Sequence, residues 1–176
     1  MASINEITLA AQCAKGNSMA QRQVYEIYAQ PMMLVCNRYI TDVHDAQEVL
    51  SDGFYNFYKG IGSFTYVGEG SMKAWLKKIM VNQCLMHLRK KKMVFADTEI
   101  AEQVAVNEEV LAKLSAKEIL QQVRKLPDGY RTVFNLYLFD GKTHAEIAAM
   151  LSISESTSKS QLHKAKAWLQ KEIGKF

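Results

Sequence analysis

Residues that suggest chemistry lie in the N-terminal half of this 176-residue chain, where aromatic side chains adjoin a run of cations. Seven aromatic residues occur from Phe54 to Trp75, and seven cations without one acid occur from Lys73 to Lys92. Aromatic rings stack on unpaired bases and cations neutralise phosphates, so this composition is typical of a surface for single-stranded nucleic acid. Stacking contributes on the order of 1–3 kcal/mol per base, enough to offset the few kcal/mol needed to extract a base from a duplex. The helical spacing of Phe54, Phe57 and Tyr58 indicates core, and the binding candidates are Phe64, Tyr66, Lys73, Trp75, Lys78 and Arg89.

The second candidate is the polar face of a helix expected at 154–173. Thr143 and Glu146 form a capping-box signature for a short helix, and Ser154 can cap the helix that follows it. In that second helix one stripe is expected to be buried: Ser158, Leu162, Ala165 and Leu169. The opposite face mixes hydroxyls and cations, which reach base edges and phosphates respectively. The pattern indicates a helix-turn-helix whose DNA-binding candidates are Ser156, Thr157, Lys159, Ser160, His163 and Lys164, although either helix alone could be an ordinary surface helix.

A third candidate surface is acidic. Residues 42–52 hold four acids and no cation, and Asp45, Glu48 and Asp52 share one side of a helix at spacings of three and four. Because such a face repels DNA, we expect it to contact a protein. A solvated helix face explains the same pattern equally well.

The elements that must position these candidates are helices. Apolar residues recur at intervals of three to four, and no run alternates as a strand does. We therefore predict an all-α protein of two small helical domains joined by an acidic linker. The expected helices lie at 5–15, 18–40 (bent or broken at Pro31), 43–59, 71–92, 107–124, 128–139, 143–151 and 154–173. The expected domains are 1–92 and 113–176, and the linker is 93–112, where acids dominate and large apolar residues are few.

Composition excludes several classes of protein. The net charge of +4 permits a nucleic-acid partner without requiring one. Three scattered cysteines and four scattered histidines form no disulfide framework or metal site, so we expect no metal, no cofactor and a reducing compartment. Neither a signal peptide nor a membrane-spanning stretch is present, which predicts a cytoplasmic protein without membrane insertion. Phosphate-loop and S-x-x-K look-alikes at 141–143 and 156–159 lack their partner motifs, so we expect no catalytic residues and no enzyme.

In these motifs the chain resembles an extracytoplasmic-function (ECF, group IV) sigma factor of the sigma-70 family. DAQEVL at 45–50, GIGSF at 60–64, WLKKIMVN at 75–82 and LRK at 88–90 are similar to the family's region 2. LPDGYR at 126–131, EIA at 146–148 and TSKSQLHKAK at 157–166 are similar to its region 4. The motifs occur in the family's order and cover about two-thirds of the chain.

The resemblance implies a role for each surface. Asp45, Gln47, Glu48 and Asp52 would bind core RNA polymerase at the β′ clamp helices, with the β flap as a further contact. The loop 63–71 and the helix after it would melt the −10 element of promoter DNA, and Asn82 would hold a flipped-out base. The recognition helix would read the −35 element, and the linker would pass through the polymerase cleft. An anti-sigma factor is the implied regulator.

The chain departs from the family pattern at several positions. Ser152 stands where glycine is usual in the turn, so the turn is expected to differ. Ser158 replaces a usual Val or Ile in the buried stripe, which costs apolar burial unless its hydroxyl bonds to the preceding turn. Gln161 replaces a frequent Arg and removes one candidate DNA contact. The loop before Trp75 is about two residues longer than is common.

The expected function is therefore to direct core polymerase to specific promoters and to promote their opening. A helix-turn-helix repressor or activator that binds duplex operators is the alternative, but it leaves the aromatic loop and the acidic helix unexplained. A nucleic-acid enzyme is the other alternative, and it would need a metal cluster or phosphate loop that the sequence lacks.

Overall fold

A computed structural model describes residues 5–91 and 116–173, and all regular structure in these residues is helical. The all-α prediction is confirmed. The chain divides into two units, Met1–His87 and Leu88–Phe176, each considered separately below. The expected linker at 93–112 lies outside the described residues, as does the first part of the helix expected at 107–124.

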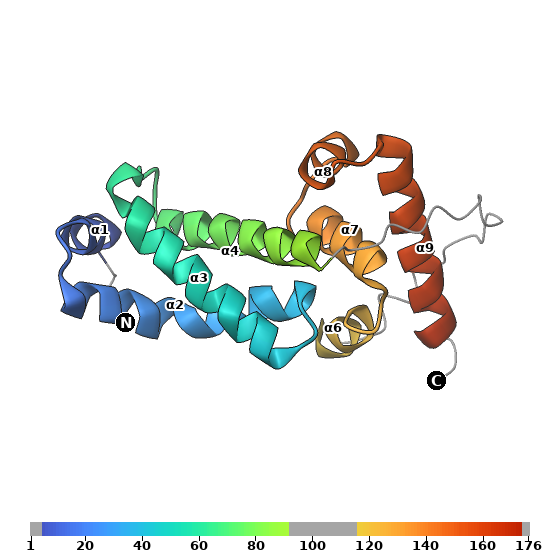
Figure 1. The fold of residues 1–176 in the computed structure, drawn as a ribbon, viewed down its shortest axis with the longest axis horizontal. Helices are drawn as coiled ribbons and strands as arrows, with labels where there is room; N and C mark the ends of the chain where they lie inside the picture. Colours follow the sequence, from blue (N-terminus) through green and yellow to red (C-terminus); the bar gives the residue numbers. More distant parts are fainter. Residues whose placement is uncertain (1–4, 92–115, 174–176) are drawn as a thin grey trace. The chain divides into compact units, whose positions relative to one another are not determined.

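The N-terminal unit is built from α1 (Glu6–Ala14), α2 (Ser18–Tyr39), α3 (Val43–Gly60), the short 3-10 helix η1 (Ile61–Ser63) and α4 (Ser71–Lys90), whose residues from Leu88 on are assigned to the second unit (Figure 1). Side-chain caps begin its first three helices, because the carbonyl or carboxylate of Asn5, Asn17 and Asp42 accepts a backbone N–H three residues on. Buried residues at helical spacing then line each helix, such as Val24, Tyr28, Met32, Cys36 and Tyr39 of α2.

Two features of this unit were not fully predicted from the sequence. We expected a bend or a break at Pro31, and the break is absent because α2 is one helix from Ser18 to Tyr39 that contains this proline. Gly53 lets α3 approach α4 closely, since a Cβ built there would lie 2.2 Å from the sulfur of the fully buried Met80. This close approach keeps the acidic helix against the basic one.

The C-terminal unit consists of α6 (Ala116–Val123), α7 (Asp128–Leu138), α8 (His144–Leu151) and α9 (Glu155–Ile173). Helix α9 packs against the other three, and α7 also contacts α8. The expected stripe of Ser158, Leu162, Ala165 and Leu169 is buried as predicted. The apolar seam of this small domain therefore forms around α7 and α9.

A buried arginine, absent from the sequence-based expectations, fixes the turn between α6 and α7. The Arg131 guanidinium donates to the carbonyl of Leu126 at 2.7 Å and to that of Arg124 at 3.5 Å, and it pairs with the Asp128 carboxylate. Carbonyls just after a helix end have no partner within the helix, so a buried cation satisfies them here.

Candidate functional site

The helix-turn-helix forms where the sequence predicted it. Thr143 and Glu146 make the reciprocal capping box at the start of α8, and the Ser154 hydroxyl accepts the N–H of Thr157 at 3.0 Å to cap α9. The Glu146 carboxylate accepts the Thr143 N–H and the Lys142 ammonium, both at 2.9 Å. These hydrogen bonds, led by the backbone one, lower the pKa of Glu146 to about 2. Both helix starts are thus fixed by side chains rather than by burial alone.

The turn between the two helices depends on one strained residue. Ser152 ends α8 with φ 56° and ψ 44°, the left-handed conformation that usually selects glycine. We expected this turn to differ from that of the family, and the conformation of Ser152 gives no sign of such a difference. The serine adopts the conformation that glycine would adopt and accepts its steric cost.

Ser158 finds a different partner from the one expected. Its Oγ lies 2.9 Å from Nδ1 of His144, the first residue of α8, rather than bonding within its own helix. The Tyr137 ring stacks on the His144 ring, with centroids 4.8 Å apart. Burial and the nearby Lys159 lower the pKa of His144, against a smaller opposite effect of Glu155. A polar contact between α8 and α9 thus replaces the apolar one that Val or Ile would make.

The candidate DNA-contacting residues of α9 divide by exposure. Ser156 and Lys159 are exposed, and Thr157, Ser160 and His163 are half-buried. The expectation that Lys164 lies on the open face does not hold, because that residue is only 9% exposed. Gln161 is buried too. Lys164 was expected to be exposed because the spacing of apolar residues indicated only one buried stripe on this helix. In the structure α9 packs against three helices, so its buried face is wider than that stripe.

In the N-terminal unit several of the clustered aromatic side chains pack against one another. Trp75 contacts Phe57 and Phe64 at centroid distances of 5.1 and 5.5 Å. Phe64, one of the binding candidates, therefore already packs against Trp75. Tyr66 is 43% exposed and Val67 is 85% exposed, so the free part of the loop is its middle.

Cationic and amide side chains on α4 share one face beside these rings. Trp75, Lys78, Asn82 and Arg89 recur at intervals that keep them within about 60° of one another at 100° per residue. Lys78, Asn82 and Arg89 are exposed and Trp75 is half-buried. Lys73 is also exposed, but the same geometry places it on the other side of the helix. The structure therefore brings most of the predicted strand-binding residues together and separates Lys73 from them.

The acidic surface on α3 is exposed at Gln47, Glu48 and Asp52. Asp45 differs, because its carboxylate lies 3.5 Å from Nε2 of His87 on α4 and is half-buried. Sequence reasoning missed Tyr55, which is 66% exposed on the same side of α3. Its spacing of eight residues from Gln47 was the signal that could have identified it.

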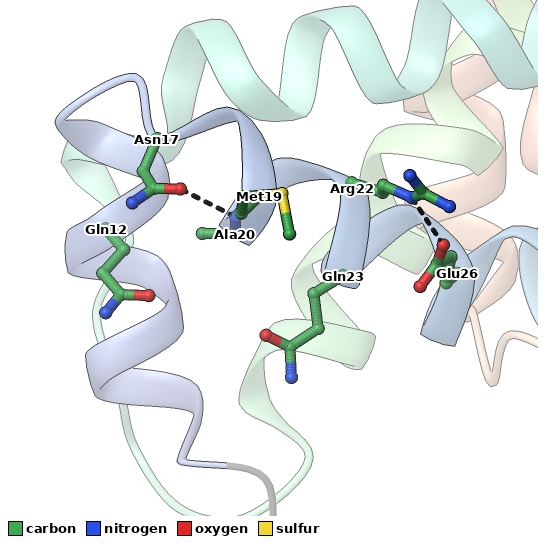
Figure 2. Close-up of a pocket in the computed structure, with 7 residues that line it drawn as sticks. All are labelled: Gln12, Asn17, Met19, Ala20, Arg22, Gln23 and Glu26. Atoms are coloured by element: carbon green, nitrogen blue, oxygen red, sulfur yellow. Dashed lines mark hydrogen bonds and ion pairs between the residues drawn. The ribbon is translucent and has the colours of Figure 1, made fainter.

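A shallow hollow of about 520 Å³ lies elsewhere, where α1 meets α2 (Figure 2). Figure 2 shows Gln12, Asn17 and Gln23 around it, with the Arg22–Glu26 ion pair along α2. None of the predicted site residues lines it. Within residues 5–91 and 116–173, no group of three His, Cys, Asp or Glu is placed to hold a metal ion. Nor does any helix among those residues have the length and apolar character needed to cross a membrane.

Comparison with known proteins identifies both units. The family model for sigma-70 region 2 matches residues 24–93, and that for sigma-70 region 4 matches residues 116–169. The ECF RNA polymerase sigma factor SigW of Bacillus subtilis (strain 168) is 29% identical over 92% of this chain and 93% of its own length. The ECF sigma factor SigM of Mycobacterium tuberculosis (strain ATCC 35801 / TMC 107 / Erdman) is 28% identical over 74% of this chain and 65% of its own length.

A solved structure of CnrH in complex with the cytosolic domain of CnrY aligns with 96% of this chain and 96% of its own chain. The sequence identity is 22% and the TM-score is 0.49.

Proposed function

This chain belongs to the sigma-70 family of RNA polymerase sigma factors, in the ECF group, and from that premise we propose which of its surfaces does which part of the work. It is a factor that directs core RNA polymerase to promoters and promotes their opening. Sigma factors are initiation factors, and we propose that this one performs no covalent chemistry itself.

One observation carries the proposal. Both sigma regions occur in one chain, in order, with an exposed nucleic-acid-binding composition in each. The alternative, a helix-turn-helix repressor or activator, accounts only for α8 and α9. It gives no role to a region 2 match that spans residues 24–93.

For the −10 element, the proposed contacts centre on α4 and the loop before it. The exposed Tyr66 and the half-buried Trp75 offer ring surface for unpaired bases, and Asn82 can hydrogen-bond to a base edge. Lys78 and Arg89 share that face and suit phosphates, as does Lys73 from the other side of the helix. Phe64 packs against Trp75, and we propose that it contacts DNA less directly than Tyr66 does.

For the −35 element, Lys159 and Ser156 are the best exposed of the candidates on α9. Thr157, Ser160 and His163 can contribute through their polar tips. Lys164 is buried, so we leave it out of the proposed DNA contacts. A helix with small hydroxyls and one exposed lysine near its N-terminal end fits the major groove.

For core polymerase, the proposed surface is the exposed acidic side of α3, with Gln47, Glu48 and Asp52 at its centre and Tyr55 beside them. The β′ clamp helices are the proposed partner there, and the β flap is the proposed partner of the C-terminal domain. We propose domains at 1–92 and 113–176 with a linker at 93–112. An anti-sigma factor would hide the same surfaces when the factor is idle, and the role places the protein in the cytoplasm.

Reconstitution tests the proposal. Purified chain is added to core RNA polymerase and to fragmented DNA of its source organism, and transcripts are mapped by their 5′ ends. The proposal expects core binding and a shared pair of upstream elements among the start sites. Tight sequence-specific binding to duplex DNA by the chain alone, without core binding, would favour the repressor.

A further inference from the structure

A buried carboxylate on α1 contacts the helix that carries the proposed −10 surface. Glu6 is 7% exposed, and its Oε2 accepts the backbone N–H of Met72 at 3.1 Å. The Tyr28 hydroxyl donates to the other oxygen, Oε1, at 3.5 Å. Met72 lies in the first turn of α4, where backbone N–H groups have no partner within the helix and an anion is favoured.

Helix α1 also reaches the other end of the same loop. It packs against η1, which ends at Ser63, while Glu6 bonds to the start of α4. The loop 64–70 runs between these two attachment points, and Figure 1 shows α1 beside the start of α4 at one end of the unit. Within the loop, the Ser71 hydroxyl accepts the N–H of Val67 at 3.1 Å and donates to the carbonyl of Gly68. The loop is therefore held at both ends and its backbone is tied to Ser71 at Val67 and Gly68, while the side chains of Tyr66 and Val67 stay exposed.

Glu6 occupies an apolar position. It shares the buried stripe of α1 with Leu9, Ala10 and Cys13. A buried charge costs desolvation that an apolar side chain of similar size avoids, so stability alone does not favour glutamate there. What glutamate adds is an acceptor that fixes the direction of the first turn of α4. Three residues later in that helix comes Trp75.

We propose that Glu6 is a positioning residue for promoter opening. It holds the first turn of α4 and the loop 64–70 in the arrangement that receives unpaired bases on Tyr66, Trp75 and Asn82. The inference rests on the proposed function, since it names a residue that supports the same −10 surface. Glu6 lies outside the residues 24–93 that match region 2, so the support comes from the chain that precedes that region.

The test uses the full chain with core polymerase and two promoter templates, one fully paired and one pre-melted across the −10 element. Glu6→Met removes the acceptor and keeps an unbranched side chain. Glu6→Gln keeps an acceptor for the Met72 N–H. Glu26→Met is the matched control, because Glu26 is an exposed glutamate of α2 that pairs only locally with Arg22. Affinity for core and the rate of opening are measured for each.

We expect Glu6→Met to slow opening of the paired template by about tenfold, the factor for the loss of one hydrogen bond. Formation of the open complex on the pre-melted template should be slowed less, because no base pair has to be broken there, and core affinity should be unchanged. Glu6→Gln should retain most of the wild-type rate and Glu26→Met all of it. A Glu6→Met protein that opens the paired template normally would overturn the inference. So would equal losses on both templates together with lost core binding, which would make Glu6 merely structural.

Tyr28→Phe provides a second variant if Glu6→Met does not fold. It removes only the hydroxyl that orients the Glu6 carboxylate and should slow opening of the paired template alone, by a smaller factor. Normal opening by Tyr28→Phe would then count against the inference. If the wild-type chain opens neither template with core polymerase, the proposed function fails, and that outcome is distinct from these.

Discussion

His144 Nδ1 and Ser158 Oγ lie 2.9 Å apart and join the first residue of α8 to the buried side of α9. Ser158 is fully buried, and the Tyr137 ring stacks on the imidazole. This polar contact therefore adds to the packing of α8 against α9. Because only α9 carries the recognition face, the contact helps to fix how that face is presented.

Replacing one partner should cost more than replacing both. Ser158→Val leaves the half-buried imidazole without its hydroxyl partner and should lower the free energy of unfolding of the C-terminal unit by about 1–2 kcal/mol. Adding His144→Phe to Ser158→Val should recover most of that loss, since two apolar groups can replace a polar pair almost neutrally. Urea unfolding of the two single variants and the double variant measures the coupling. Strictly additive losses would contradict a direct interaction.

Acid should weaken the C-terminal unit through His144. Its pKa in the folded protein lies below the ordinary value of 6.5, chiefly because of burial and then because of Lys159. Above pH 6.5 both states are neutral and the group contributes nothing to pH dependence. As the pH falls through 6.5, the unfolded state binds the proton first, so the free energy of unfolding decreases.

Comparison with His144→Asn isolates this effect from the other histidines. The difference in free energy of unfolding between wild type and variant is measured from pH 7.5 to pH 5. We expect the wild type to lose stability faster than the variant over that interval. Parallel curves would mean that His144 does not titrate differently in the two states.

The turn at Ser152 offers a stabilising substitution. Ser152→Gly removes the β-carbon from a residue in the left-handed backbone conformation. It should raise the free energy of unfolding by roughly 0.5–1 kcal/mol. Ser152→Ala is the control, because it keeps the β-carbon and should give no such gain. Fluorescence of Trp168 follows this unit when Trp75 is replaced by Phe. Equal stability of the Gly and Ala variants would argue against strain at this turn.

Substitutions at Gly53 and Met80, made singly and together, should reveal the close packing of α3 against α4. Gly53→Ala places a methyl group against the Met80 sulfur and should destabilise the N-terminal unit by roughly 1–3 kcal/mol, despite the better helix propensity of alanine. Met80→Ala leaves a cavity when made alone. In the double variant the new methyl group enters that space, so the combined loss should be smaller than the sum. Additive losses would mean that the two helices separate rather than clash.

The features predicted correctly from the sequence are those that depend on the spacing of apolar residues and on helix capping. The helix at 43–59 was expected within one residue of α3, Val43–Gly60, because Asp42 and Gly60 mark its ends. The capping box at Thr143 and the buried stripe through Leu162 were also correct. These features need only local interactions and one apolar face. The family's two regions were recognisable for the same reason, since their motifs are contiguous in the chain.

The features that depend on contacts between particular helices were not predicted from the sequence. The periodicity of apolar residues shows that one face of a helix is buried but not which helix packs against it. Lys164 was therefore expected to be exposed, although it is buried. The contact between Phe64 and Trp75 was not predicted. Asp45 was grouped with the acidic face although it turns toward His87. Glu6 did leave a signal, because a carboxylate in an otherwise apolar stripe is unusual. Its partner Met72 is 66 residues away and could not be read from spacing.

We propose that the Asn82 face of α4 receives the promoter strand and that the acidic face of α3 binds core polymerase. The most direct test of this proposal is permanganate reactivity of promoter thymines in complexes of core polymerase with wild type or Asn82→Ala, alongside the core affinity of each. The account predicts a roughly tenfold slower appearance of −10 reactivity for Asn82→Ala, about one lost hydrogen bond, with unchanged core affinity. Unchanged opening, or equal loss of opening and core binding, would contradict it.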